Sequence, residues 1–106
     1  MDAQPTSTWA DHARRTERVR VSMRAGFRKR GMTRADGDLV DLSAHGFRID
    51  TTCVLSVGME VWLNLPGFEP RAATVAWTEG FQAGCKFDEP FNEIVMASFL
   101  QRHGFT

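Results

Sequence analysis

Apolar and polar residues alternate along most of the chain from Val19 onward. Over Val19 to Arg28, residues of one parity are apolar, and those between them are mostly Arg, Ser or Gly. Because successive side chains of a β-strand point to opposite faces, this pattern predicts a strand with one buried face. Similar alternation predicts five more strands, at roughly 39–43, 47–51, 59–65, 71–78 and 81–87. In the fifth predicted strand the inward parity is that of Ala73, Val75 and Trp77. In the sixth predicted strand it includes Phe81.

The spacing of apolar residues changes after Pro90. They then recur every three or four positions, as on one face of a helix: Phe91, Ile94, Val95, Phe99 and Leu100. Asp88 or Glu89 suits the helix N-terminus, Pro90 suits the first helical position, and Gly104 is a plausible end. Six strands and one helix predict an all-β fold, a small six-stranded antiparallel barrel or strongly bent sheet whose C-terminal helix covers one opening.

The stretch VDLSAHGFRID, residues 40–50, breaks the alternation at Gly46. Since a strand with one buried face should hold one parity, we expect one strand to end here and the next to begin. The turn should need a residue without Cβ at Gly46, with a backbone near the positive-φ region, and should leave Asp41 and Ser43 on an outward face. Asp and Ser can also open a turn simply by bonding their own backbone.

Length and composition bound the class of protein. A chain of 106 residues, 42% hydrophobic, suits one globular domain. We expect residues 1–13 to be a flexible tail and residues 14–106 to form the domain. There is neither an apolar leader nor a stretch of transmembrane length, so we expect a cytoplasmic protein that does not insert into membranes. Cys53 and Cys85 lack metal-ligand spacing and are expected to be reduced thiols in or near the core.

Charge is divided unevenly although the formal net charge is zero. Residues 1–34 hold nine basic and three acidic residues, and the remainder holds four basic and ten acidic ones. Eight of the nine basic residues are Arg, whose planar fork fits phosphate and stacks on rings. This asymmetry indicates that the N-terminal part meets an anion, although an arginine-rich solvated face would look the same.

Catalytic patterns are missing from the sequence. The three histidines, His12, His45 and His103, fall in a tail, a turn and a helix end, and no CxxC, HExxH or P-loop is present. Asp41, Ser43 and His45 share a strand parity, but about 7 Å separates alternate residues on a strand, which is too far for a hydrogen-bonded relay. We therefore expect neither an enzyme nor a metal site.

Two short motifs remain, RRTER with Arg14 and Arg18, and DLSAHG with Asp41, Ser43 and Gly46. The combination of RxxxR with a DxSxxG about two dozen residues later resembles the PilZ domain family, and the strand pattern and the GCKFDEP run before the helix suit that family's barrel. The resemblance covers roughly residues 12–103.

The resemblance implies a receptor for cyclic di-GMP, a bacterial second messenger with two guanines and two phosphates. By that resemblance Arg14 and Arg18, helped by Arg15, would grip guanine edges and phosphates. Asp41 and Ser43 would contact a guanine and a phosphate, and Gly46 would let the backbone come close to the ligand. The protein would then signal through an effector protein that the sequence does not identify.

Two other functions stay open at this point. A PilZ-like interaction module that binds no nucleotide would have the same fold. A small barrel with a basic arm could also bind single-stranded nucleic acid. That reading expects aromatic residues among the basic ones on an exposed sheet face, and the exposed parity of the first strand carries none. We therefore do not expect a nucleic-acid partner.

Overall fold

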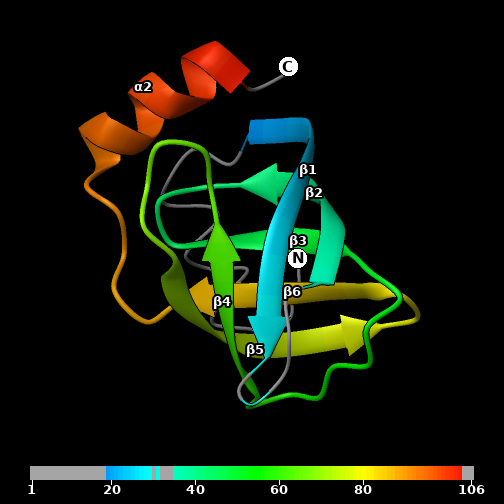
Figure 1. Ribbon diagram of the computed structural model, residues 1–106. Helices are drawn as coiled ribbons and strands as arrows, with labels where there is room; N and C mark the ends of the chain where they lie inside the picture. Colours follow the sequence, from blue (N-terminus) through cyan, green and yellow to red (C-terminus); the bar gives the residue numbers. More distant parts are fainter. Residues whose placement is uncertain (1–18, 30, 32–34, 104–106) are drawn as a thin grey trace, which may run out of the picture.

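The chain folds into a closed antiparallel barrel, as predicted (Figure 1). The computed structural model describes residues 19–29, 31 and 35–103. The strands are β1 (Val19–Lys29), β2 (Ala35–Leu42), β3 (Gly46–Asp50), β4 (Glu60–Asn64), β5 (Arg71–Glu79) and β6 (Gln82–Phe87). Around the barrel they follow the order β1-β2-β3-β6-β5-β4, and each neighbouring pair is antiparallel. The C-terminal helix, α2 (Glu93–His103), covers one end.

The barrel interior is filled by the apolar residues that alternate along each strand. The largest fully buried side chains are Phe27, Phe47, Phe87, Phe99, Leu39, Leu42, Ile49, Leu63 and Met96. Close packing of these side chains and removal of their apolar surface from water are the main stabilising terms of such a small core. Cys85 lies within it and Cys53 is half-buried, and both are free thiols as expected.

Three strand pairs contain a shift of register, and these shifts change which residues face outward. In β2, Leu39 pairs with Ile49 and Asp41 with Arg48, so β2 has one residue more than β3 over this stretch. β5 likewise has an extra residue between Val75 and Trp77. A bulge of this kind inverts the parity that follows it. Trp77 is therefore only half-buried, and the prediction that it shares the inward face of Val75 is wrong.

The helix begins later than predicted, and only part of its predicted apolar face is buried. Asn92 caps it, because its Oδ1 accepts from the amides of Ile94 at 2.9 Å and Val95 at 3.1 Å. Pro90 therefore precedes the helix. Ile94 is 80% exposed and Val95 43%, so these two lie outside the buried face, whereas Phe99 and Leu100 are buried as predicted and Met96 is buried with them.

The rings that surround the helix explain this face. Phe99 packs against Phe68 of the β4–β5 loop, with centroids 5.8 Å apart, and Phe91 contacts both Phe68 and Phe87. Phe91 is buried but lies before the helix, so it does not mark the helical face on which the sequence pattern placed it. Phe81 was also predicted to point inward, yet it lies in the β5–β6 turn and is 74% exposed.

Candidate functional site

The start of β1 lies beside the end of β2. Val19 pairs with Leu42, and Arg20 pairs with Asp41. Residues 14, 15 and 18 lie outside the described part of the chain, so the structure does not place the three arginines predicted to bind the ligand. It does place the chain that follows Arg18 directly against the DxSxxG segment. Val19, the first described residue after the RxxxR motif, therefore lies at the same end of the β1–β2 pair as the DxSxxG segment.

The β2–β3 connection is a two-residue turn at Ala44 and His45. The amide of Ser43 donates to the carbonyl of Gly46 at 2.9 Å, and Leu42 pairs with Phe47. Across such a turn, paired residues have sequence numbers of opposite parity, so the inward parity changes where the chain reverses. The break in alternation at Gly46 is thus the hairpin itself, as the sequence pattern predicted.

The expectation of a positive φ at Gly46 is wrong. The described glycines with positive φ are Gly31, Gly58, Gly67 and Gly80, and no described non-glycine residue has one. A two-residue hairpin turn of type I′ needs positive φ at both central residues, so this turn is built differently. The hydroxyl of Ser43 accepts from the amides of His45 at 3.2 Å and Gly46 at 3.3 Å. The reading in which Ser bonds its own backbone is therefore confirmed for Ser43.

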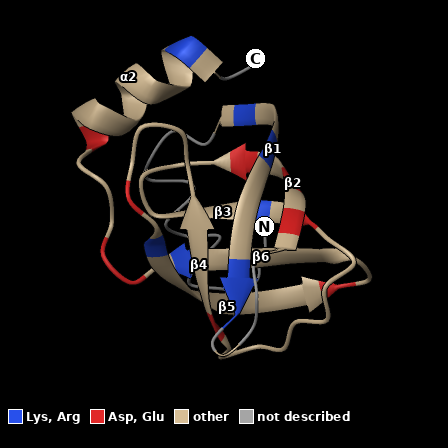
Figure 2. Cartoon of the chain, in the orientation of Figure 1, with Lys and Arg blue, Asp and Glu red and all other residues tan. Residues whose placement is uncertain are grey.

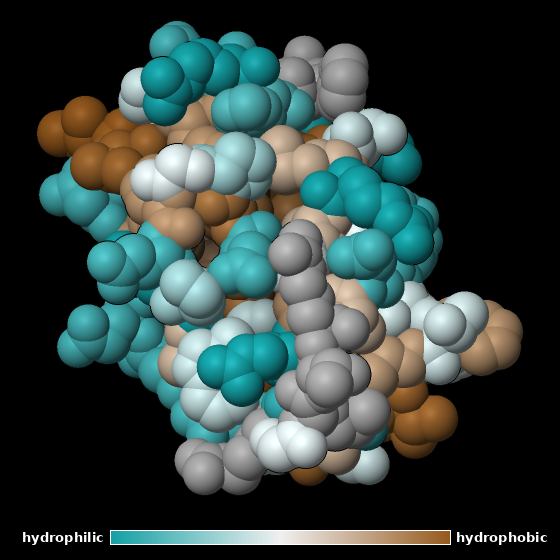
Figure 3. All heavy atoms as spheres, in the orientation of Figure 1, coloured by the Kyte–Doolittle hydropathy of each residue, from teal (hydrophilic) through white to brown (hydrophobic). Residues whose placement is uncertain are grey.

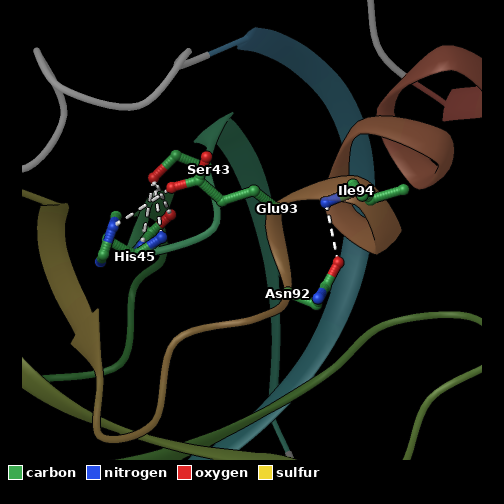
Figure 4. Close-up of polar contacts among 6 residues, drawn as sticks. Ser43, His45, Asn92, Glu93 and Ile94 are labelled. Atoms are coloured by element: carbon green, nitrogen blue, oxygen red, sulfur yellow. Dashed lines mark hydrogen bonds and ion pairs between the residues drawn. The ribbon is translucent and has the colours of Figure 1, made fainter.

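The turn is also bonded to the segment that leads into α2. The amide of Phe87 donates to the carbonyl of His45 at 2.8 Å, and that of Phe91 to the carbonyl of Ala44 at 2.9 Å. The Nε2 atom of His45 lies 4.0 Å from a carboxylate oxygen of Glu93, the first residue of the helix. Figure 4 shows the turn and the first helical residues facing one another. The turn is therefore in direct contact with the helix N-terminus, so a change in the turn's conformation acts on the helix directly.

Asp41 is ion-paired with Arg48, which lies opposite it on β3. The Asp41 side chain is 4% exposed and that of Arg48 is 30% exposed. Leu39 and Leu42 both point into the core, so the bulge between them turns Asp41 to the outer surface of the barrel, where it is nevertheless covered. The expected outward direction is correct, whereas an open carboxylate at the surface is not what the structure shows.

Arg48 was not among the predicted site residues. The alternation of Phe47, Arg48 and Ile49 shows only that Arg48 faces outward. Its place beside Asp41 depends on the β2–β3 register, which the turn and the bulge set together. The two-residue turn was the signal that could have indicated the pairing. Once Leu42 lies opposite Phe47, the preceding residue Asp41 lies opposite the following residue Arg48.

The same row of the barrel continues onto β6 and β5. Arg48 lies opposite Gly84, and Gly84 opposite Trp77. A Cβ on Gly84 would overlap the indole of Trp77, so the ring lies across the glycine. The outer surface thus carries, from β1 to β5, Arg20, Asp41, Arg48, Gly84 and Trp77. An acid flanked by two arginines beside an aromatic ring can hydrogen-bond, neutralise an anion and stack.

Charge in the described residues follows the division seen in the sequence. Figure 2 shows Lys and Arg along β1 and Asp and Glu on the neighbouring β2. One such cross-strand pair, Arg24 with Asp38 at 3.1 Å, is exposed on both sides. Exposed pairs of this kind contribute little to stability.

Comparison with known proteins identifies the family. The PilZ domain family matches the chain over residues 12–101, and the chain belongs to it. The PilZ domain is a non-catalytic receptor domain, and here it occupies nearly the whole sequence. No curated protein matches the chain significantly. Within the described residues, the one α-helix is too short to span a bilayer.

Proposed function

We propose that the protein binds cyclic di-GMP and acts as a cytoplasmic receptor. Arg14, Arg15 and Arg18 are the arginines of the arm, and Asp41, Ser43 and Gly46 form the second part of the site. The observation that carries this proposal is the β1–β2 register. Val19, which follows Arg18 in the chain, lies opposite Leu42 and so beside the turn that holds Ser43 and Gly46, which supports a site formed by both motifs.

The chemistry of the ligand suits this combination. Two guanidinium forks can meet guanine O6 and N7 or a phosphate oxygen pair, and the ligand carries two negative charges. The sheet surface beside the turn already holds Arg20 and Arg48 in register with Asp41. Two arginines against one aspartate give this surface an excess of positive charge, which favours the binding of a dianion.

We further propose that the signal passes to an effector protein through α2. The carbonyls of Ala44 and His45 are bonded to the segment before the helix, so a ligand on the turn acts on that segment directly. Figure 3 shows apolar surface over the N-terminal half of α2, where Ile94 and Val95 are exposed. An exposed apolar helix face is the kind of surface that a partner protein covers.

A PilZ module that binds no nucleotide remains a second candidate. The apolar face of α2 is already exposed in the ligand-free fold, so a partner could bind it without any messenger. Isothermal titration with cyclic di-GMP separates the two functions, because only the receptor binds the nucleotide.

The decisive experiment is a titration of the parent and of two arm variants. If each arginine makes a charge-assisted contact, Arg14→Ala and Arg18→Ala should each cost about 1–3 kcal/mol of binding free energy, roughly ten- to a hundred-fold in affinity. Lys29→Gln is the control, because Lys29 ends β1 far from the arm and bonds the carbonyl of Val54. Unchanged affinity in both arm variants would show that the arm is not part of the site. Absence of binding by the parent would favour the second candidate, a PilZ module that binds no nucleotide.

A further inference from the structure

Arg48 has a hydrogen-bonding capacity that the free protein leaves unused. Its Nη2 faces the carboxylate of Asp41, whereas its Nε is buried and has no hydrogen-bond partner among the described residues. Guanidinium has five N–H donors, and a buried donor without an acceptor is costly. Because this Nε is buried, a ligand can reach only the exposed part of the Arg48 side chain.

The exposures of the two side chains decide which of them a ligand meets. Asp41 is 4% exposed and is ion-paired with Arg48, of which 30% is exposed. A carboxylate that is buried needs a paired cation, and Arg48 is one such partner of Asp41. A molecule arriving at this surface therefore meets the guanidinium first.

The surface next to Arg48 is an aromatic face on which a ligand base can stack. Its neighbour on β6 is Gly84, which has no side chain, and the indole of Trp77 lies across that glycine. The guanidinium of Arg48 is thus held by Asp41 on one side, and on the other side its neighbour is Gly84 with the indole of Trp77 lying across it. Restraint by Asp41 reduces the conformational entropy that Arg48 would lose on binding.

From these contacts we infer that Arg48 contacts the guanine or phosphate acceptors of the ligand, and that Asp41 is a positioning residue that acts through Arg48. The inference rests on the proposed function, and it changes the role that the DxSxxG motif implies for its aspartate. A fork fixed by a carboxylate can present two parallel N–H groups to guanine O6 and N7 or to a phosphate.

A double-mutant cycle on the full chain tests the inference, with cyclic di-GMP affinity as the readout. Arg48→Lys keeps a cation for Asp41 but removes the planar fork, so the melting temperature of the free protein should stay close to that of the parent while affinity falls about tenfold or more. Asp41→Asn should also weaken binding. If Asp41 acts through Arg48, adding Asp41→Asn to Arg48→Lys should change affinity by less than about threefold.

The Arg24–Asp38 pair offers a matched control, since it is also a cross-strand Arg–Asp pair on the outside of the barrel. Arg24→Lys should leave affinity unchanged. Full affinity in Arg48→Lys would overturn the contact. If the fold-losses of affinity caused by Asp41→Asn and Arg48→Lys multiply in the double variant, Asp41 binds the ligand independently, and its positioning role is overturned. Absence of binding by the parent would instead refute the proposed function and this inference with it.

Discussion

The indole ring of Trp77 occupies the space that a side chain on Gly84 would need. The two residues lie opposite each other on β5 and β6, directly after the extra residue in β5. Glycine within a strand loses conformational entropy on folding and offers no side chain to pack, so its presence calls for a local reason. The ring of Trp77 supplies that reason, because only glycine allows the indole to lie against the sheet.

Gly84→Ala should therefore destabilise the protein by about 1–3 kcal/mol through overpacking. The methyl group would overlap the indole Nε1 and Cε2 atoms, and the ring would have to leave its position. Urea denaturation followed by circular dichroism measures the loss. In a Trp77→Ala background the same substitution should cost much less, and an equal cost in both backgrounds would show that the ring is not the obstacle.

The hydroxyl of Ser43 should matter for folding as well as for binding. It accepts from the amides of His45 and Gly46, and Ser43 is 1% exposed. Ser43→Ala leaves these amides without that acceptor, so we expect a loss of about 1 kcal/mol or more in unfolding free energy. Ser56→Ala is the control, because Ser56 is exposed in a loop. Equal melting temperatures for parent and Ser43→Ala would mean that water replaces the hydroxyl.

The buried thiol of Cys85 predicts a loss of stability at alkaline pH. Burial raises the pKa of Cys85 from its ordinary value of 9.0 to about 12. Because the folded-state pKa is the higher one, the unfolded chain releases this proton first, so the stabilising contribution is complete below pH 9 and disappears as the pH rises toward 12. The stability difference between the parent and Cys85→Ala should shrink by about 1 kcal/mol per pH unit above pH 9. A constant difference from pH 7 to 11 would contradict the prediction.

The barrel could be predicted because each strand buries one face. That requirement imposes a period of two on the sequence, and the inward residues of β1, β3 and β4 follow it closely. The β2–β3 turn was equally visible, since chain reversal forces the parity to change. Both features are local consequences of alternation.

The positions of Trp77 and of the helix face depend on contacts that alternation does not record. One extra residue before Trp77 moves the ring from the core to the surface, and nothing in the pattern of Ala73, Val75 and Trp77 distinguishes a regular strand from a bulged one. Ile94 and Val95 satisfy a helical repeat as well as Met96 does. The rings of Phe68 and Phe91 determine which side of α2 packs on the barrel.

The pairing of Asp41 with Arg48 shows the same limit within the candidate site. Each residue is visible as an outward polar position, but only the register brings them together. Whether an acid in a binding motif is open or already paired is therefore a property of the folded sheet.

A last prediction concerns the bonds that join the site to the helix. If cyclic di-GMP binds at the β2–β3 turn, it should stabilise the turn against local opening. The amides of Phe87 and Phe91 donate to His45 and Ala44, so their hydrogen exchange should become slower when the nucleotide is added.

The amide of Met59 is the internal control, because it donates to the carbonyl of Ser56 at 3.0 Å in the loop before β4, which belongs to neither the site nor its hydrogen bonds to the helix. Its exchange rate should not change beyond any effect on global unfolding. Hydrogen exchange followed by NMR, with and without saturating cyclic di-GMP, measures all three amides in one experiment. Equal protection of Phe87, Phe91 and Met59 would indicate only a general stabilisation by ligand binding. Tight binding with no slowing at Phe87 and Phe91 would separate the nucleotide from the helix, and the signal to a partner would then have to leave the protein by another surface.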